Sequence, residues 1–290
     1  MTAAMTDHSL DLNVLSWALA VEKASRAANA LPPAGALPDP LADLTDEQRQ
    51  ALEAELHAAG LTDDDGALTP DWQRTLTRAA EAPLTLELVA RSSGVSVHCD
   101  VSLAGGSGLA RTTSRTVREL PDGRIVTEAV GERMAVTEFS EESLWAVVSA
   151  ALPDFAELTS TAMPSIDREE RIPVTASELA AVNAATRATV QLSVAAGRQI
   201  ATGVPDPGSP LYRSVHLWLL TDRLFEVRTT PARQVDGGAD GPDAAGAALE
   251  GRPGVVLIPQ EPGTLARQLV WDVLGAQQFL SSAAEGGARS

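Results

Sequence analysis

The last predicted strand and helix of the chain share an apolar pattern with a segment 121 positions upstream. Residues 255–258 form a short apolar run that is typical of a strand covered on both faces. Pro262 suits the first turn of the helix that follows. The shared positions pair Met134 with Val255, Val136 with Leu257, Leu144 with Leu265, Val148 with Leu269, and Leu152 with Val273. We interpret the pattern as two related halves, against the alternative of coincidence between two ordinary strand–helix units.

The helix that begins after Pro262 is expected to face the core with one apolar stripe. Its members are Leu265, Leu269, Val270, Val273 and Leu274. Burial of five such side chains is worth about 10 kcal/mol before the loss of conformational entropy is subtracted. This unit is therefore expected to close the core.

Composition and charge exclude several classes of function. The net charge of −17 disfavours binding to nucleic acid or to anionic lipid. Cys99 is the only cysteine, which excludes an intrachain disulfide and a zinc site built on cysteines. The sequence has no basic start and no membrane-length apolar run, so we expect a cytoplasmic location without membrane insertion.

The first half, residues 1–153, is predicted to contain helices, an antiparallel meander and a closing helix. Helices are expected over residues 10–29, after a capping box at Thr45, and after Thr69-Pro70. Alternation of apolar and polar residues predicts strands at 84–88, 95–101, 113–119, 124–130 and 134–139. Pro121-Asp122-Gly123 marks a hairpin turn between two of them. Residues 144–152 form the closing helix.

The second half, residues 154–290, is predicted to repeat this order, and the two halves to form one compact domain. Residues 153–173 are expected to be an irregular connection. A capping box at Thr175–Glu178 opens a helix that we expect to continue toward Val194. Residues 215–220 and 224–228 suggest a second hairpin, and 204–210 a loop. Residues 234–253, rich in Gly, Ala and Asp, are interpreted as a mobile insertion, and residues 281–290 as a frayed tail.

The sequence contains no convincing catalytic or metal-binding constellation. Ser107 lies in a glycine-rich turn with His98 nearby, but the spacing of a nucleophile elbow fails at Leu109. The four histidines lack the spacing of a metal site, and Asp63–Gly66 lacks the ligand pattern of a calcium loop. The five tryptophans are interpreted as core or interface residues. We therefore expect a non-enzymatic α+β protein that needs no metal or other cofactor.

Several stretches resemble the EspG family, the cytosolic chaperones of actinobacterial type VII (ESX) secretion. They include Glu-Ala-Glu-Leu-His-Ala-Ala-Gly-Leu at 53–61 and Leu68-Thr69-Pro70 before the third helix. They also include the strand after Ala82-Pro83, the helix that ends in Ala151-Leu152-Pro153, and Val-Leu-Ile-Pro-Gln-Glu-Pro-Gly-Thr-Leu-Ala at 256–266. The resemblance extends from Leu12 to Phe279. The 234–253 insertion and the glycine turn at 105–108 are departures from it.

The resemblance implies a fold, a partner and a binding surface. The fold is a central antiparallel β-sheet flanked by two helical groups, with halves related by a pseudo-two-fold axis. The partner is a secreted, helical PE–PPE-type heterodimer whose apolar tip is kept soluble until export, and a homodimer of the chaperone is compatible with this role. The corresponding surface comprises the hairpin loop Glu119, Leu120, Pro121, Asp122 and Gly123, together with Arg267, Trp271 and Gln278 of the last helix.

Two other functions remain open from the sequence. A serine hydrolase would use Ser107 as the nucleophile and His98 as the base. A small-ligand-binding protein would use a cleft between the halves.

Overall fold

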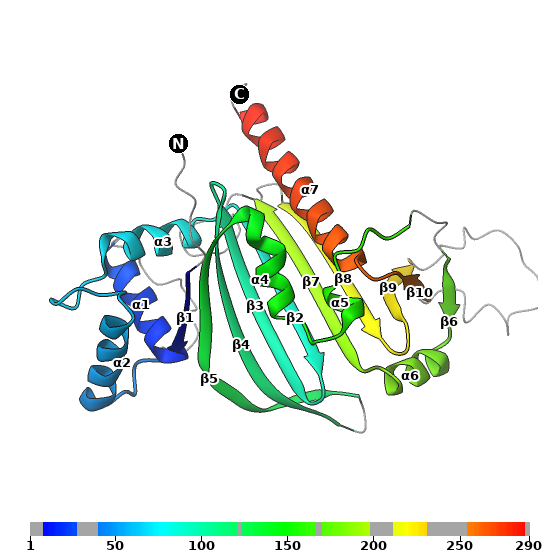
Figure 1. The fold of residues 1–290 in the computed structure, drawn as a ribbon, viewed down its shortest axis with the longest axis horizontal. Coiled ribbons are helices and arrows are strands. Elements are labelled where there is room, and N and C mark those ends of the chain that lie inside the picture. The colour runs from blue at the N-terminus through cyan, green and yellow to red at the C-terminus, as the bar shows by residue number, and fades with distance from the viewer. Residues whose placement is uncertain are drawn as a thin grey trace, which may run out of the picture.

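A computed structural model describes residues 8–27, 40–120, 123–165, 170–197, 211–230 and 254–287. The predicted loop at 204–210 and the predicted insertion at 234–253 lie outside these residues. The predicted α+β class with a large antiparallel sheet is confirmed (Figure 1).

One continuous antiparallel sheet forms the centre of the described fold. Its order is β1-β5-β4-β3-β2-β7-β8-β9-β10-β6. The strands are β1 (His8–Asn13), β2 (Leu84–Ser92), β3 (Val95–Ala104), β4 (Ser107–Glu119), β5 (Ile125–Ser140), β6 (Ile172–Val174), β7 (Ala188–Gly197), β8 (Leu211–Leu220), β9 (Leu224–Thr230) and β10 (Gly254–Gln260). The N-terminal and C-terminal halves meet where β2 pairs with β7, from Leu84 opposite Ala196 to Ser92 opposite Ala188.

Most of the helices form two groups on opposite faces of the sheet. They are α1 (Val14–Ala27), α2 (Asp46–Ala58), α3 (Pro70–Ala80), the 3₁₀ turn η1 (Glu141–Ser143), α4 (Leu144–Ala150), α5 (Ala156–Thr159), α6 (Ala176–Ala184) and α7 (Thr264–Gly287). Figure 1 shows α4, α5 and α7 in front of the sheet and α1, α2 and α3 at its β1 end. Leu109 belongs to the core beneath α1–α3, and its neighbour Ala110 to the core beneath α4 and α7. Because successive strand residues point to opposite faces, the two helical groups pack on opposite faces.

The face that packs against α4 and α7 is named the covered face. Leu86 and Leu88 of β2 and Leu192 of β7 are buried there, together with Leu144 and Val148 of α4. From α7, the same core receives Leu265, Leu269 and Val273. These three residues align with Leu144, Val148 and Leu152 in the sequence pattern, and all six are buried in one core. The pattern therefore identified the core faces of both closing helices.

On the opposite side of the sheet, the surface of the four central strands β3, β2, β7 and β8 is named the open face. It presents Glu87, Val89 and Arg91 of β2, with the residues paired to them on β3 and β7. Polar and charged side chains dominate it on β3, β2 and β7, whereas β8 contributes mainly apolar residues such as Val215 and Leu217. Helix α3 lies against β3 and β4 on this same face and bounds the open face toward β1.

The predicted helix over residues 10–29 is wrong at its start. Residues 8–13 form β1, which pairs with β5 so that Leu12 lies opposite Met134. Leu12 is 1% exposed, buried beneath the N-terminal helices. Asn13 then accepts a hydrogen bond from the Leu15 amide at 2.8 Å, and α1 begins at Val14. Pairing with a distant strand outweighs local helical spacing here.

The predicted helix from Thr175 toward Val194 is wrong at its end. The capping box is confirmed, since the side chains of Thr175 and Glu178 each bond to the other residue's backbone amide. Helix α6 ends at Ala184, however, and β7 begins at Ala188. Thr189, Val190 and Val194 are β-branched and favour the strand.

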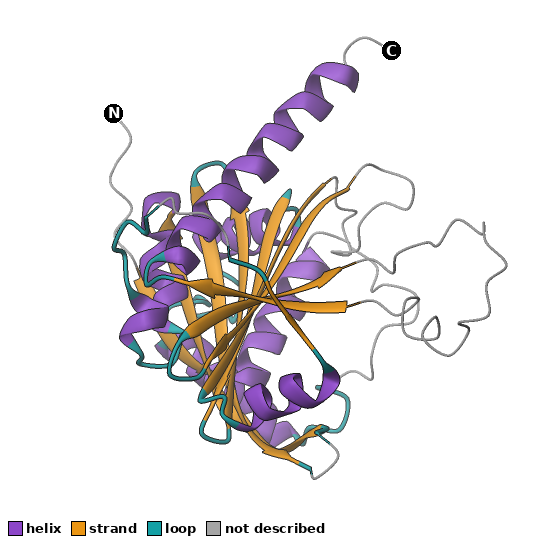
Figure 2. Cartoon of the chain, turned by 90° about the vertical axis from the view of Figure 1, so that its right-hand side faces the viewer, coloured by secondary structure: helices purple, strands orange, loops and turns teal. Residues whose placement is uncertain are grey.

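Two further expectations require correction. The connection at 153–173 is not wholly irregular, because it contains α5 and the start of β6. The predicted frayed tail from residue 281 is helical as far as Gly287, as the last turns of α7. Both views show α7 continuing beyond the end of the sheet (Figures 1 and 2).

Candidate partner-binding surfaces

A bent hairpin arm is built from the outer parts of β4 and β5, between Arg115 and Val130. Its register is interrupted between Thr113 and Arg115 and again between Thr116 and Val117. At both places β5 contains more residues than β4, which bends the ribbon and increases its twist. The first interruption lies where β1 stops pairing with β5, at Arg133. Figure 1 shows the arm crossing the lower ends of β3 and β2 toward β7.

The arm ends in the turn predicted from Pro-Asp-Gly, and the predicted hairpin is confirmed. The Leu120 amide donates to the Arg124 carbonyl at 2.7 Å, and the Gly123 amide donates to the Leu120 carbonyl at 2.9 Å. Gly123 has a φ of +78°, which favours glycine. Glu119 is exposed and Leu120 half-buried, while Pro121 and Asp122 lie outside the described residues.

Helix α7 exposes an apolar stripe on the side away from the sheet. Trp271 is 64% exposed, Val270 55% and Leu274 50%. Arg267 and Gln278 continue the same side of the helix, the first half-buried and the second exposed. The prediction that Val270 and Leu274 face the core is therefore wrong, because the apolar side chains that the helix buries are Leu265, Leu269, Val273 and Ala276. The sequence left Trp271 open between a core and an interface position, and its exposure shows that it is not a core residue.

The structure does not bring the arm and the α7 stripe together. The arm folds over the open face, where Val117 and Ile125 line a cavity with Gln191 of β7. Helix α7 packs on the covered face against the alternate residues of β7, such as Leu192. The two sets of predicted contact residues therefore lie on opposite faces and form two separate surfaces.

A buried ionic cluster fixes α7 to the sheet, and the sequence did not reveal it. His216 of β8 places Nδ1 3.1 Å from Glu226 Oε1 of β9 and Nε2 3.2 Å from Asp272 Oδ2 of α7. Arg228 donates two hydrogen bonds to Glu226, at 3.0 and 2.8 Å. Burial alone would lower the pKa of His216, but the two carboxylates raise it to about 9. Burial would raise the pKa of Glu226, and His216 and Arg228 hold it below its usual value.

This cluster is arranged for charge pairing rather than for metal binding. Its carboxylates lie at opposite nitrogens of one ring, so their oxygens do not converge on a common point. Within the described residues no group of His, Cys, Asp and Glu could hold a metal ion. Asp63, in the stretch that resembles a calcium loop, instead accepts hydrogen bonds from the amides of Asp65 and Ala67, both at 3.0 Å.

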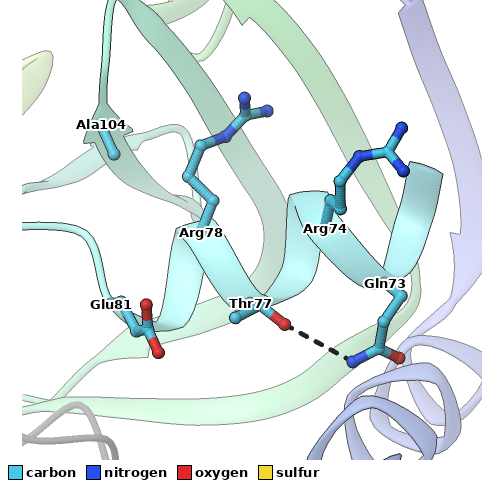
Figure 3. Close-up of a pocket in the computed structure, with 6 residues that line it drawn as sticks. All are labelled: Gln73, Arg74, Thr77, Arg78, Glu81 and Ala104. Atoms are coloured by element: carbon cyan, nitrogen blue, oxygen red, sulfur yellow. Dashed lines mark hydrogen bonds between the residues drawn. The ribbon is translucent and has the colours of Figure 1, made fainter. Parts of the chain in front are cut away.

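A groove of about 390 Å³ runs along α3 where that helix approaches the end of β3 (Figure 3). Its lining residues are Gln73, Arg74, Thr77, Arg78, Glu81 and Ala104. Arg78 is engaged with Glu138 at 3.0 Å, and the Gln73 amide donates to the carbonyl of Ala24 at 3.3 Å. These contacts seat α3 on the sheet and on α1, and no nucleophile–base pair is found among the lining residues.

The hydrolase interpretation requires Ser107 and His98 to meet, and the structure keeps them apart. His98 pairs with Thr113 across β3 and β4, six residues from Ser107 along β4. At about 3.3 Å per residue, this places the two residues roughly 20 Å apart. The Ser107 hydroxyl donates instead to the Ala104 carbonyl at 3.1 Å.

Comparison of the chain with known protein families and with curated proteins finds no match in either. No helix in the described part of the chain is long and apolar enough to cross a membrane. The candidate surfaces therefore rest on their own geometry and on the sequence resemblance.

Proposed function

We propose that this protein is a cytoplasmic chaperone or adaptor that binds a helical type VII secretion substrate of PE–PPE type and makes or breaks no covalent bonds. The observation that carries this proposal is the α7 stripe. Val270, Trp271 and Leu274 are each at least half exposed on adjacent turns of one helix. Contiguous exposed apolar surface of this kind is typical of protein–protein interfaces.

The chemistry of the stripe suits a helical partner. Trp271 provides a large apolar ring in the middle of the stripe, and tryptophan is enriched among residues that dominate binding energy. Arg267 and Gln278 flank it with polar groups, as at the rim of an interface. An amphipathic helix of the partner could lay its own apolar face along this stripe.

We further propose that the two halves are related as in the EspG family. The strand order supports this, since β2-β3-β4-β5-β1 extends to one side of the centre and β7-β8-β9-β10-β6 to the other. In each half the fourth strand of the meander leads into a helix that packs on the covered face, α4 or α7. The closing helices differ, because α4 ends at Ala150 and only α7 reaches past the sheet.

Co-expression with a PE–PPE heterodimer tests the proposal. We expect the wild-type chain to co-elute with the heterodimer in size-exclusion chromatography. Val270→Asp should abolish co-elution, because it places a charge in the apolar interface. Val21→Asp is the matched control, since Val21 is also an exposed helical valine, 40% exposed on α1. If the wild type co-elutes with none of the candidate heterodimers, the proposal is wrong.

A further inference from the structure

A cavity of about 190 Å³ lies between the hairpin arm and the open face of the sheet. The arm contributes Val117, Ile125 and Thr127, and the sheet contributes residues of β2, β3, β7 and β8. The bend of the arm therefore partly covers the sheet face and leaves a half-open site. This site is separate from the α7 stripe.

The strand register places the basic groups of the cavity side by side. One row of paired residues crosses the four strands. It runs from Arg115 of β4 through Ser96 of β3 and Arg91 of β2 to Thr189 of β7. The next row carries His98 of β3. Two guanidinium groups and an imidazole thus share the site with hydroxyl groups.

The charge of this lining is unusual for a chain of net charge −17. Among the described residues no Asp or Glu lines the cavity. The Arg115 Nε atom is buried without a hydrogen-bond partner. Burial lowers the pKa of Arg91, and Glu119 at the end of the arm opposes this effect. A buried donor without a partner costs free energy unless a ligand or water supplies the acceptor.

A neighbouring cavity of about 380 Å³ on the same face serves as an internal comparison. Its lining contains Glu87 and Asp100 as well as Arg111 and Arg213, and Asp100 lies 3.8 Å from Arg111. Charge is balanced within that cavity. Of these two cavities on the open face, only the one beneath the arm has an excess of positive charge in its lining.

We propose that the cavity beneath the arm binds a small anion bearing a phosphate, sulfate or carboxylate group, through Arg91, Arg115 and His98. Guanidinium groups bind such oxyanions through paired, charge-assisted hydrogen bonds. Ser96, Thr127 and Gln191 supply further polar groups at the same site. The arm forms one wall of the cavity through Val117, Ile125 and Thr127.

Isothermal titration calorimetry of the full chain with sodium sulfate and sodium malonate, at constant ionic strength set with chloride, tests this site. We expect at least one of the two anions to bind with one-to-one stoichiometry. Arg115→Gln and Arg91→Gln should each weaken binding by about tenfold or more, because each removes a charge-assisted contact. Preference for sulfate or for malonate then distinguishes a tetrahedral from a carboxylate ligand.

Arg118→Gln is the matched control. Arg118 lies on the same strand as Arg115 but pairs with Glu128 at 2.5 Å, outside the cavity lining. The Arg118→Gln variant should bind the anion with the same affinity as the wild type. Arg115→Lys keeps the charge and should retain part of the affinity, which separates loss of the site from loss of the fold.

The His98 ring gives an independent readout by NMR titration. Burial and Arg115 hold the pKa of His98 below its usual value; Asp100 and Glu87 act in the opposite direction, and Arg91 lowers it further. A bound dianion should raise this pKa, since it stabilises the protonated ring. Absence of binding by both anions, or binding that Arg91→Gln and Arg115→Gln leave unchanged, would overturn the proposal.

Discussion

His216 Nε2 lies 3.2 Å from Asp272 Oδ2, and this contact joins β8 to the middle of α7. Asp272 is 4% exposed and directly follows Trp271, the largest side chain of the exposed stripe. One helix therefore holds the sheet through a buried carboxylate and exposes an apolar surface at the adjacent residue. The ion pair and the buried apolar side chains Leu265, Leu269 and Val273 hold the same face of α7 against the sheet, which leaves Trp271 on the exposed side.

Stability should depend on the protonation of His216. Its pKa of about 9 in the fold exceeds the reference value of 6.5, so its contribution is fully present below pH 6.5 and is lost as pH rises through about 9. We expect His216→Gln to lower the free energy of unfolding by on the order of 2–3 kcal/mol at pH 7. Urea denaturation at pH 7 and pH 10 measures this difference.

The same experiment contains its own control. At pH 10 the wild type and His216→Gln should differ much less than at pH 7, because both then carry a neutral side chain at this position. His57→Gln is the control variant, since His57 is largely exposed and pairs with the fully exposed Asp64. An equal loss for His216→Gln at both pH values would show that packing, not charge, is responsible.

Gly263 should not tolerate a side chain. Its φ is +92°, and a Cβ atom there would lie 1.8 Å from the Ala162 carbonyl oxygen. We expect Gly263→Ala to destabilise the protein by about 3 kcal/mol, from backbone strain and displacement of the 160–165 segment. Gly66→Ala separates the two causes, since Gly66 has a φ of +74° and nothing within 4 Å of an added Cβ. Gly66→Ala should cost only about 1 kcal/mol in thermal unfolding, and equal losses for both variants would contradict the steric explanation.

The EspG resemblance also implies that the turn at the end of the arm contacts the partner, as a second surface beside the α7 stripe. On that basis Leu120→Asp should weaken binding of the helical partner by about tenfold while it changes the free energy of unfolding by less than about 0.5 kcal/mol. Leu120 is half-buried at the end of the arm, and its two turn hydrogen bonds use backbone atoms that the substitution retains. Surface plasmon resonance with an immobilised PE–PPE heterodimer measures the affinity. A large loss of stability would instead place Leu120 in the core of the arm.

Local patterns in the sequence predicted the closing elements well. Leu144 and Val148 face the same core as Leu265 and Leu269, as their shared spacing indicates. The Pro-Asp-Gly turn and the capping boxes at Thr45 and Thr175 are also confirmed, because their geometry is encoded within a few residues.

Features that depend on distant strands could not be predicted in this way. β1 exists because it pairs with β5, more than a hundred residues away, and its Leu12 also fits the helical spacing of Leu15 and Leu19. His216, Glu226 and Asp272 come from three elements, so no local spacing connects them. The cavity beneath the arm depends on two register interruptions in β4 and β5 that alternation of apolar residues does not reveal.

Site-specific photocrosslinking from position 271 tests the central claim most directly. The variant Trp271→p-benzoylphenylalanine is irradiated in complex with a PE–PPE heterodimer, beside the same substitution at Val21. We predict a covalent adduct between the partner and position 271 and none from position 21, because only α7 presents the proposed docking stripe. A complex that forms normally but gives no adduct from position 271 would contradict the assignment of α7 as the binding surface.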